Sequence, residues 1–442
     1  MTILVDCGLY QERPYLDRNW EPFPVPPGEI DILLLTHAHL DHSGYIPKLV
    51  KDGFRGKILA TDATRELAEI VFLDAAQIQE EDAAFKKKRH DKEGRRGPHP
   101  EIPLYTSEDA RKSMSFFESV TYLEPRRLNE AITVRFHDAG HILGSAMLSL
   151  EIRQNESTRR IIFSGDIGSW DNPLIHDPSV FEAADYIVME STYGDRNHDD
   201  PGSIDDLLAR IITTTVARGG NVVIPVFALE RAQELMYYLG KLIAESRIPR
   251  IPVFLDSPMA VEVTNVFSRH PELLDKEAAR RVQRSRPPFD FPGLKLIASI
   301  EESKALNNLR TPAVIMAGSG MCTGGRIKHH LALNVKRPES TILFVGYQAP
   351  GTLGRQILER PPQVRIFGQM HPLKCLVAQI QGFSAHAGRV DIDRWLGAFR
   401  KPPRRLFITH GEEEVALRLA RSLEDKGWAV IVPRYLEEVK LN

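Results

Sequence analysis

A short apolar run at residues 32–35 leads directly into an HxHxDH motif formed by His37, His39, Asp41 and His42. The run is typical of a buried strand, so the motif emerges where that strand ends. Residues two apart in an extended chain point the same way, which lets His37 and His39 close on one ion. Asp41 and His42 face elsewhere on the same turn and can serve a second ion. Imidazole nitrogen beside carboxylate oxygen is ligand chemistry that suits zinc.

A chance cluster on a polar loop is the alternative, and four ligand-type residues within six positions after a strand argue against it. Four residues cannot complete two zinc shells and still hold a substrate, so further ligands must lie elsewhere. His141 stands among small residues that let the backbone approach closely. Asp166 ends a hydrophobic strand, where a carboxylate can bridge two ions, although by itself it could equally cap a helix.

Length and composition describe an ordinary globular chain. The 442 residues allow two or three domains, and 42% hydrophobic with 26% charged residues is a usual balance. The net charge is only −2, so local basic patches and metal, rather than a general positive field, must hold any polyanion.

Cysteine usage and the N-terminus predict a cytoplasmic protein. Cys7, Cys322 and Cys375 are odd in number, far apart and without CxxC spacing, which argues against disulfides and against a thiolate zinc site. The first residues carry no basic region and too short an apolar run for a signal peptide. No segment approaches the ~20 apolar residues of a membrane span, so we expect no membrane partner.

The first part of the chain alternates short strands with helices, which is an α/β pattern. Strands are expected at residues 3–5, 32–35 and 58–60, and a helix at 63–85. The charged stretch 86–103 is typical of an exposed loop between helices, and a solvated surface is the favoured interpretation over an RNA clamp.

From residue 203 a repeated strand and helix order predicts a second α/β domain, a parallel sheet covered by helices. Its strands are expected at 222–225, 253–255, 313–317 and 341–345, with helices such as 230–245 and 325–333. The final part returns to a strand, a His-bearing turn and a helix around residues 406–411.

The order of HxHxDH, His141 and Asp166 resembles the metallo-β-lactamase fold. Glu190 after a strand, His386 in Gly-Phe-Ser-Ala-His-Ala and His410 in Thr-His-Gly-Glu resemble the three extra motifs of its β-CASP branch of nucleic-acid nucleases. Stretches 225–234, 256–260, 318–326 and 346–355 are similar to the RNA-processing members, which include bacterial relatives of the cleavage and polyadenylation endonuclease. The resemblance covers nearly the whole chain.

This resemblance implies an αββα sandwich of metallo-β-lactamase type with an inserted β-CASP α/β domain. The sandwich would comprise residues 1–199 and 356–442, and the β-CASP domain residues 200–355. Family members usually carry a further strand pair before the segment that matches residues 2–8. We therefore expect that either the start of the sequence is misplaced or one edge of the N-terminal sheet is short.

The resemblance also implies a ligand set for two Zn²⁺ ions. His37, His39 and His141 would hold one ion, Asp41, His42 and His410 the other, and Asp166 would bridge them. Two such ions about 3.5–4 Å apart lower the pKa of a shared water towards ~7 and stabilise both oxygens of an in-line displacement.

The catalytic residues implied by the family are Asp41, His386 and Glu190. His386 would protonate the leaving 3′ oxygen, and Glu190 would orient it and raise its basicity. From the residues alone, the favoured interpretation of His386 is a capped turn histidine, and that of Glu190 is a strand-end glutamate.

A glycine-rich stretch at residues 318–325 offers consecutive backbone amides before a helix, an arrangement that cradles phosphate oxygens. Together with the family match, this stretch predicts that RNA or phosphate is contacted by Ser319, Gly320, Thr323 and Arg326. Arg231 and Arg355 are weaker candidates for the same role.

The function expected is a zinc-dependent ribonuclease that hydrolyses phosphodiester bonds of single-stranded RNA in RNA processing or decay. Endonucleolytic cutting is favoured, and a 5′ to 3′ exonuclease stays open, because the choice depends on whether a pocket closes around a 5′ phosphate. A histidine at 410, in place of the aliphatic residue of the DNA-directed branch, favours RNA. Two alternatives stay open: a lactamase-fold hydrolase of a small thioester, lactone or β-lactam, and a non-catalytic RNA-binding subunit. A homodimer is compatible with the sequence.

Overall fold

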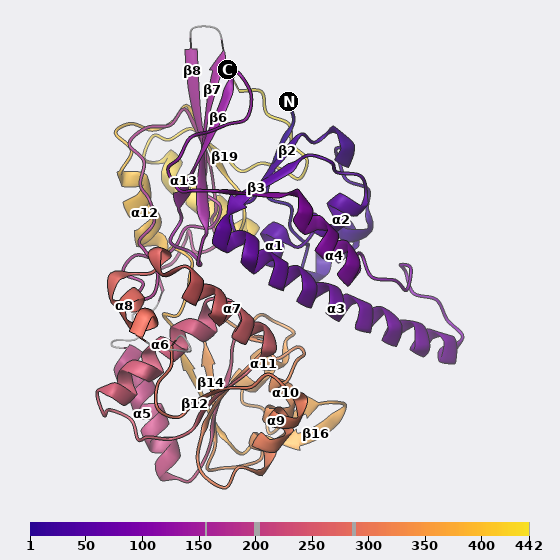
Figure 1. Ribbon diagram of the computed structural model, residues 1–442, viewed down its shortest axis with the longest axis vertical. Helices are drawn as coiled ribbons and strands as arrows, with labels where there is room; N and C mark the ends of the chain where they lie inside the picture. Colours follow the sequence, from indigo (N-terminus) through magenta and orange to yellow (C-terminus); the bar gives the residue numbers. More distant parts are fainter. Residues whose placement is uncertain (155–156, 199–203, 285–288, 442) are drawn as a thin grey trace. The chain divides into compact units, whose positions relative to one another are not determined.

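The computed structural model describes residues 1–154, 157–198, 204–284 and 289–441 (Figure 1). The chain forms two compact units. Unit 1 contains Met1–Asp171, His176–Arg196 and His386–Asn442, and unit 2 contains Asn172–Ile175 and Asn197–Ala385. No helix among the described residues is long and apolar enough to cross a membrane.

Unit 1 is built on two sheets. The first is parallel, with strands in the order β1 (Ile3–Val5), β2 (Ile32–Leu34), β3 (Lys57–Thr61) and β4 (Phe117–Val120). The second has the order β19-β18-β9-β8-β7-β6-β5, and its strands are β5 (Arg126–Arg127), β6 (Ile132–Asp138), β7 (Ala146–Gln154), β8 (Ser157–Phe163), β9 (Tyr186–Met189), β18 (Arg405–Ile408) and β19 (Val430–Ile431). Strands β8, β9, β18 and β19 are parallel, so strands that precede unit 2 in the chain and strands that follow it share one sheet.

The two sheets pack face to face through an apolar core. Leu34 and Leu59 of the first sheet share one buried cluster with Phe136 and Leu148 of the second. Helices cover the outer faces (Figure 1). They are α1 (Leu40–Ser43), α2 (Ile46–Lys51), α3 (Asp62–Glu93) and α4 (Ser107–Ser113) beside the first sheet, and α12 (Arg389–Gly397) and α13 (Glu413–Glu424) beside the second. The predicted αββα sandwich is confirmed.

Helix α3 is longer than the sequence suggested. A helix was expected at 63–85 and a loop at 86–103, but the helix continues to Glu93, so the loop prediction is wrong for residues 86–93. Lys and Arg are good helix formers, and nothing in this segment breaks a helix before Gly94. Gly94 ends α3 in the left-handed region with φ +61°, which glycine adopts at little cost.

Unit 2 contains a parallel sheet in the order β12-β11-β13-β10-β14-β17, as predicted. Its strands are β10 (Val222–Pro225), β11 (Val253–Asp256), β12 (Leu294–Leu296), β13 (Val314–Ala317), β14 (Thr341–Val345) and β17 (Leu376–Ile380), with a separate hairpin of β15 (Gln363–Ile366) and β16 (Gln369–Pro372). Its helices are α5 (Ile204–Ala217), α6 (Arg231–Ala244), α7 (Pro258–Arg269), α8 (Lys276–Arg284), α9 (Ile300–Ala305), α10 (Ile327–Asn334) and α11 (Leu353–Leu358).

Helices cover both faces of this sheet. Successive residues of a strand point to opposite faces of the sheet, and neighbouring residues of β14 contact helices on both faces. Thr341 bonds to Thr215 of α5 through their hydroxyls, whereas Ile342 shares a buried cluster with Leu331 of α10. The expected covering of a parallel sheet by helices is therefore confirmed for unit 2.

The division of the chain differs from the expected one at the second boundary. The inserted domain was expected to end at residue 355, but unit 2 continues to Ala385. The reason is strand pairing, because β17 adds to the edge of the parallel sheet by pairing with β14. In this register Thr341 lies opposite Leu376, and Val345 lies opposite Ile380. Residues 356–385 thus complete the sheet of unit 2.

Candidate metal centre

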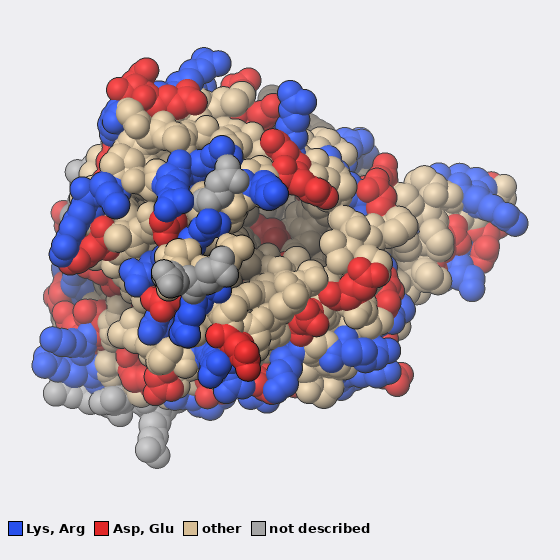
Figure 2. All heavy atoms as spheres, turned by 90° about the horizontal axis from the view of Figure 1, so that it is seen from above, with Lys and Arg blue, Asp and Glu red and all other residues tan. Residues whose placement is uncertain are grey.

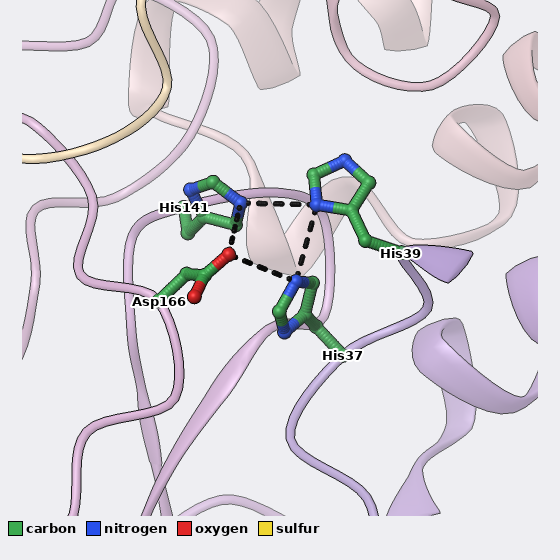
Figure 3. A group of neighbouring side chains, drawn as sticks. All are labelled: His37, His39, His141 and Asp166. Atoms are coloured by element: carbon green, nitrogen blue, oxygen red, sulfur yellow. Dashed lines mark hydrogen bonds and ion pairs between the residues drawn. The ribbon is translucent and has the colours of Figure 1, made fainter. Parts of the chain in front are cut away.

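Three histidines and one aspartate of unit 1 point toward one another (Figure 3). His37 and His39 follow β2, His141 lies between β6 and β7, and Asp166 follows β8. The Nδ1 atom of His39 lies 3.1 Å from Nε2 of His37 and 3.1 Å from Nε2 of His141. The Oδ2 atom of Asp166 lies 3.3 Å from Nε2 of His37 and 3.4 Å from Nε2 of His141.

These separations fit a cation. Four ligand atoms placed tetrahedrally at about 2.0 Å from zinc would lie about 3.3 Å from one another. All four residues lie in the turns that follow strands. The turns meet in space, which explains why residues far apart in the sequence lie together. His37, His141 and Asp166 are almost fully buried, which excludes water from three of the four donors.

A second group lies beside the first. Asp41 and His42 belong to the short helix α1, and His410 follows β18 with a left-handed φ of +43°. The Nε2 atoms of His42 and His410 are 3.1 Å apart, and Oδ2 of Asp41 lies 3.4 Å from Nε2 of His410. The structure thus brings together all seven residues that the sequence proposed as metal ligands.

Asp166 stands between the two groups. Its Oδ2 atom faces the first group, and its Oδ1 atom lies 3.2 Å from Nε2 of His42 in the second. Oδ1 is buried and accepts no hydrogen bond from the described residues. A buried carboxylate oxygen without a donor is costly, and a cation would compensate it. The donor set on both sides of Asp166 therefore fits bound metal cations.

The charge states of the first group suit a cation. Burial lowers the pKa of His39 to about 3 and also holds the pKa values of His37 and His141 below their usual range. Burial opposes ionisation of Asp166, but the neighbouring His410 and His42 hold its pKa well below the ordinary value. Neutral imidazoles with free lone pairs beside an ionised carboxylate are the form in which these side chains bind metals.

The second group differs because carboxylates surround its histidines. Although burial favours the neutral ring, Asp166 and Asp6 raise the pKa of His42 well above its ordinary value. Burial acts on His410 in the same direction, but Asp166 and Asp41 raise its pKa to about 9. This group therefore carries protons that a metal ion would displace.

Asp6 is a supporting residue that the sequence reasoning missed. Its Oδ2 atom lies 2.7 Å from Nδ1 of His42, so the other ring nitrogen of His42 faces Asp166 and His410. The same carboxylate accepts the backbone N–H and the hydroxyl of Thr36, each at 2.8 Å. A signal was present, because Asp6 directly follows a strand, as Asp166 does.

Close backbone contact holds two of the ligand-bearing turns together. A Cβ atom at Gly168 would lie 1.7 Å from the carbonyl oxygen of Gly140, the residue before His141. The N–H of Gly168 donates to the carbonyl of Ala139 at 2.8 Å. Gly140 itself has φ +64°. Only glycine at 168 allows the turn after Asp166 to approach the His141 loop this closely.

His386 and Glu190 form a pair at the edge of this centre. Glu190 follows β9 and is buried, and its carboxylate oxygens lie 3.2 and 3.3 Å from Nδ1 of His386. Glu190 also accepts the backbone N–H of Ile167 at 2.6 Å, which fixes it relative to Asp166. Burial lowers the pKa of His386, but Glu190 and Asp166 outweigh it, and the pKa is raised. His386 can therefore hold a proton.

The predicted RNA contacts all lie in unit 2, and none is tested by a bound ligand. The Ser319 hydroxyl accepts the N–H of Gly324 at 3.3 Å, and Thr323 is exposed. A Cβ at Gly320 would lie 2.6 Å from the ring of Phe227, so a larger residue there would displace that ring.

The three arginines differ in how much of their charge is already paired. Arg326 donates to Asp256 at 2.7 Å and to the carbonyl of Ala298 at 2.9 Å. Arg231 pairs with Glu234. Arg355 pairs with Glu359, and its side chain is 45% exposed, which makes it the most accessible of the three. Phosphate binding by these residues stays a prediction.

Comparison with known proteins agrees with the fold and the cluster. Residues 1–172 match a metallo-beta-lactamase superfamily domain, residues 232–357 a Beta-Casp domain, and residues 370–433 a Zn-dependent metallo-hydrolase RNA specificity domain. A protein named Ribonuclease TTHA0252 from Thermus thermophilus is 39% identical over 437 residues, which are 99% of this chain and 94% of that protein.

Proteins named Transcription termination factor FttA are also similar. The one from Methanosarcina mazei is 33% identical, and the one from Methanocaldococcus jannaschii is 32% identical. This chain spans 65% and 64% of their lengths, respectively.

The sandwich, the clustered His and Asp side chains and the inserted parallel sheet define a metal-dependent hydrolase of the metallo-β-lactamase superfamily. Within that superfamily, the chain belongs to the β-CASP nucleases.

Proposed function

We propose that this protein is a zinc-dependent ribonuclease that cuts single-stranded RNA endonucleolytically by a two-metal mechanism, in RNA processing or decay. The observation that carries the proposal is the position of Asp166, whose two oxygens face two separate groups of ligand-type side chains. His37, His39 and His141 would hold one ion, Asp41, His42 and His410 the other. Two cations held in this way would use every residue of both groups.

Two divalent ions bound there would supply a water of lowered pKa and positive charge for the phosphate oxygens. The protein's own contribution is to fix the geometry. Asp6 holds the ring of His42 by its Nδ1 atom, and the contact between Gly168 and Gly140 sets the distance between the Asp166 and His141 turns. Such supporting contacts orient ligands before any substrate arrives.

His386 would donate the proton that the leaving 3′ oxygen requires. Glu190 lies at Nδ1 of the ring, so the proton for the substrate would come from Nε2. Glu190 favours the protonated ring, and its own position is fixed by the N–H of Ile167. A general acid of this kind contributes roughly 10²–10⁴-fold in rate.

RNA is the substrate that the comparisons support best. The Thermus relative is named a ribonuclease and matches almost end to end, and part of this chain matches an RNA specificity domain. A hydrolase of a small substrate would have no evident use for unit 2, which spans Asn197–Ala385. A non-catalytic RNA-binding subunit would have no need for seven ligand-type residues held within reach of one another.

The test is cleavage of labelled single-stranded RNA by the purified protein, with linear and circular forms of one sequence compared. We expect close to two zinc ions per chain, loss of cutting after chelation, and cutting of the circle, which has no end for an exonuclease. Asp41→Asn and His386→Ala should each abolish cutting while circular dichroism stays unchanged.

His371→Ala, which changes a histidine of strand β16 in unit 2, is the matched control and should cut normally. Undiminished cutting by both site variants would refute the mechanism. Cutting of the linear RNA alone would overturn the endonucleolytic assignment and leave a ribonuclease that starts at an end.

A further inference from the structure

Helix α3 carries an arm that extends from unit 1 (Figure 1). The first half of the helix is anchored, with Leu67, Val71 and Phe72 buried. Beyond Ala76, only Ala83 and His90 are buried, and residues 84–89 are all exposed. The arm is thus residues 77–97, and its tip is residues 84–97.

The tip carries a concentrated positive charge. Residues 84–97 contain seven Lys or Arg and two acidic residues, a net charge of +5 in a chain whose total is −2. Figure 2 shows the arm projecting to the right, with Lys and Arg on both visible sides of its end. Arg95 pairs with Glu93, whereas Lys86, Lys87 and Lys88 have no ion-pair partner among the described residues.

An exposed aromatic side chain lies at the edge of this charge. Phe85 is 65% exposed, and it directly precedes Lys86. At this exposure, most of the ring is accessible to a partner. Basic side chains that contact phosphates, with an aromatic ring on which a base can stack, are the combination used to bind single-stranded nucleic acids.

The arm begins beside the candidate metal centre. The hydroxyl of Thr61, the N-cap of α3, donates to the carbonyl of Gly144 at 2.7 Å, three residues after His141. From residue 63 to residue 93, a helix that rises about 1.5 Å per residue extends about 45 Å. A stacked strand at about 3.4 Å per nucleotide needs on the order of 13 nucleotides to cover that distance.

We infer that the tip of α3 is a second RNA-binding site, which holds the phosphate backbone of a single strand at a distance from the metal centre. The inference rests on the proposed function for the identity of the strand. The bases contribute by stacking on Phe85, so the contact is independent of sequence. Long RNA gains from the arm, whereas an oligonucleotide of about six residues that is bound at the metal centre cannot reach it.

The experiment combines Lys86→Gln, Lys87→Gln, Lys88→Gln and Arg89→Gln in the full chain, because glutamine keeps helix propensity and removes the charge. Binding of a fluorescent 30-residue oligouridylate is measured by anisotropy in EDTA, at several salt concentrations. We expect at least tenfold weaker binding. The slope of log affinity against log salt should fall in magnitude by about 3, since each lost contact to a single strand removes about 0.7.

The matched control removes the same charge elsewhere in unit 1, by Arg111→Gln, Lys112→Gln, Arg126→Gln and Arg127→Gln, which are all exposed. It should bind within twofold of the unchanged protein. Phe85→Ala should weaken binding about fivefold or more, because stacking of one base is lost. Ile78→Ala, an exposed residue two helical turns earlier on the same face, should not.

Cleavage of a six-residue RNA separates this inference from the proposed function. The tip variant should cut it as fast as the unchanged protein, which also shows that unit 1 is folded. If the unchanged protein cuts no RNA, the proposed function fails, while the binding measurement still tests the tip. If the tip variant has the same RNA affinity and salt slope as the control variant, the inference is overturned. The tip would then be a binding site for an acidic protein surface.

Discussion

The two units each bury a histidine and an aspartate at the carboxyl end of parallel strands, yet the two clusters differ in how their polar atoms are satisfied. In unit 2 the aspartate is Asp256, the last residue of β11, with a fully buried side chain. In unit 1 it is Asp166, just beyond β8 and 2% exposed. Both would be candidate metal ligands by residue type and position alone.

The cluster of unit 2 is closed. Oδ1 of Asp256 accepts from Arg326 at 2.7 Å, and Oδ2 lies 2.6 Å from both Nε2 of His330 and the hydroxyl of Ser303. Each carboxylate oxygen therefore has a partner, and Arg326 supplies the compensating charge. A buried ion pair completed in this way is a structural element.

The cluster of unit 1 is open. Oδ1 of Asp166 accepts no hydrogen bond from the described residues, and the ring nitrogens that face it, Nε2 of His42 and Nδ1 of His410, lie 3.2 and 3.6 Å away. Burial leaves His37 and His141 neutral, so they offer lone pairs rather than protons. The two clusters contain the same residue types, but they differ in one respect. In unit 2 the protein's own side chains satisfy both oxygens of the buried carboxylate, and in unit 1 the described side chains do not. Incomplete compensation is what marks a metal centre.

The comparison predicts opposite effects of one substitution. Asp166→Asn should lower RNA cutting at least 100-fold and lower the bound zinc, because the proposed bridge loses its charge. Asp256→Asn should leave the zinc content unchanged and instead destabilise unit 2 by about 3 kcal/mol, since Arg326 keeps a charge that is no longer compensated. Zinc is measured by elemental analysis, and local stability by hydrogen exchange in β11, β13 and α10.

Loss of zinc in Asp256→Asn at unchanged stability would show that the closed cluster is not merely structural. Full zinc and full activity in Asp166→Asn would remove the distinction between the two clusters. Circular dichroism of both variants establishes that they fold.

A smaller effect is expected at the residue that supports His42. Asp6→Asn keeps the size of the side chain but weakens its hold on Nδ1 of His42, and partners of this kind usually contribute 10–100-fold to metal affinity. We expect zinc affinity, measured by competition with a chelator, to fall within that range. Asp31→Asn is the control, because Asp31 accepts the N–H of Thr2 at the far end of the same sheet and does not face the cluster. Equal affinities of the two variants would assign Asp6 a purely structural role.

Much of the fold and the candidate centre could be predicted because strand ends carry the chemistry. Apolar runs mark the strands, and the residues that follow β2, β8, β9 and β18 are His37, Asp166, Glu190 and His410. Strands β8, β9 and β18 are parallel neighbours that gather their carboxyl ends at one edge of their sheet, and β2 belongs to the sheet that packs on it. Such residues therefore meet although up to 373 positions separate them. The positions of the strands in the sequence are therefore enough to predict which residues meet.

The remaining features depend on contacts that a local pattern does not encode. Arg326 stands in a glycine-rich stretch, and its pairing with Asp256, 70 positions earlier, is not encoded by that stretch. Unit 2 ends at Ala385, 30 residues after the expected end of the inserted domain, because the pairing of β17 with β14 is a long-range event. Helix α3 continues through a charged segment, since charge does not end a helix and Gly94 does.

The smallest expected effect is on the acid stability of unit 2. Burial opposes ionisation of Asp256, but His330, Ser303 and Arg326 outweigh it and hold its pKa below the ordinary 3.8. A carboxyl group with a lowered pKa stabilises the folded state above pH 3.8, and that contribution is lost as the pH falls further, through the folded pKa. Between pH 7 and pH 3, the protection from hydrogen exchange in β11 and α10, taken relative to the intrinsic exchange rate at each pH, should therefore fall more in the unchanged protein than in Asp256→Asn, which has no proton to gain at this position. The same loss of protection in both would mean that the closed cluster contributes nothing to acid stability.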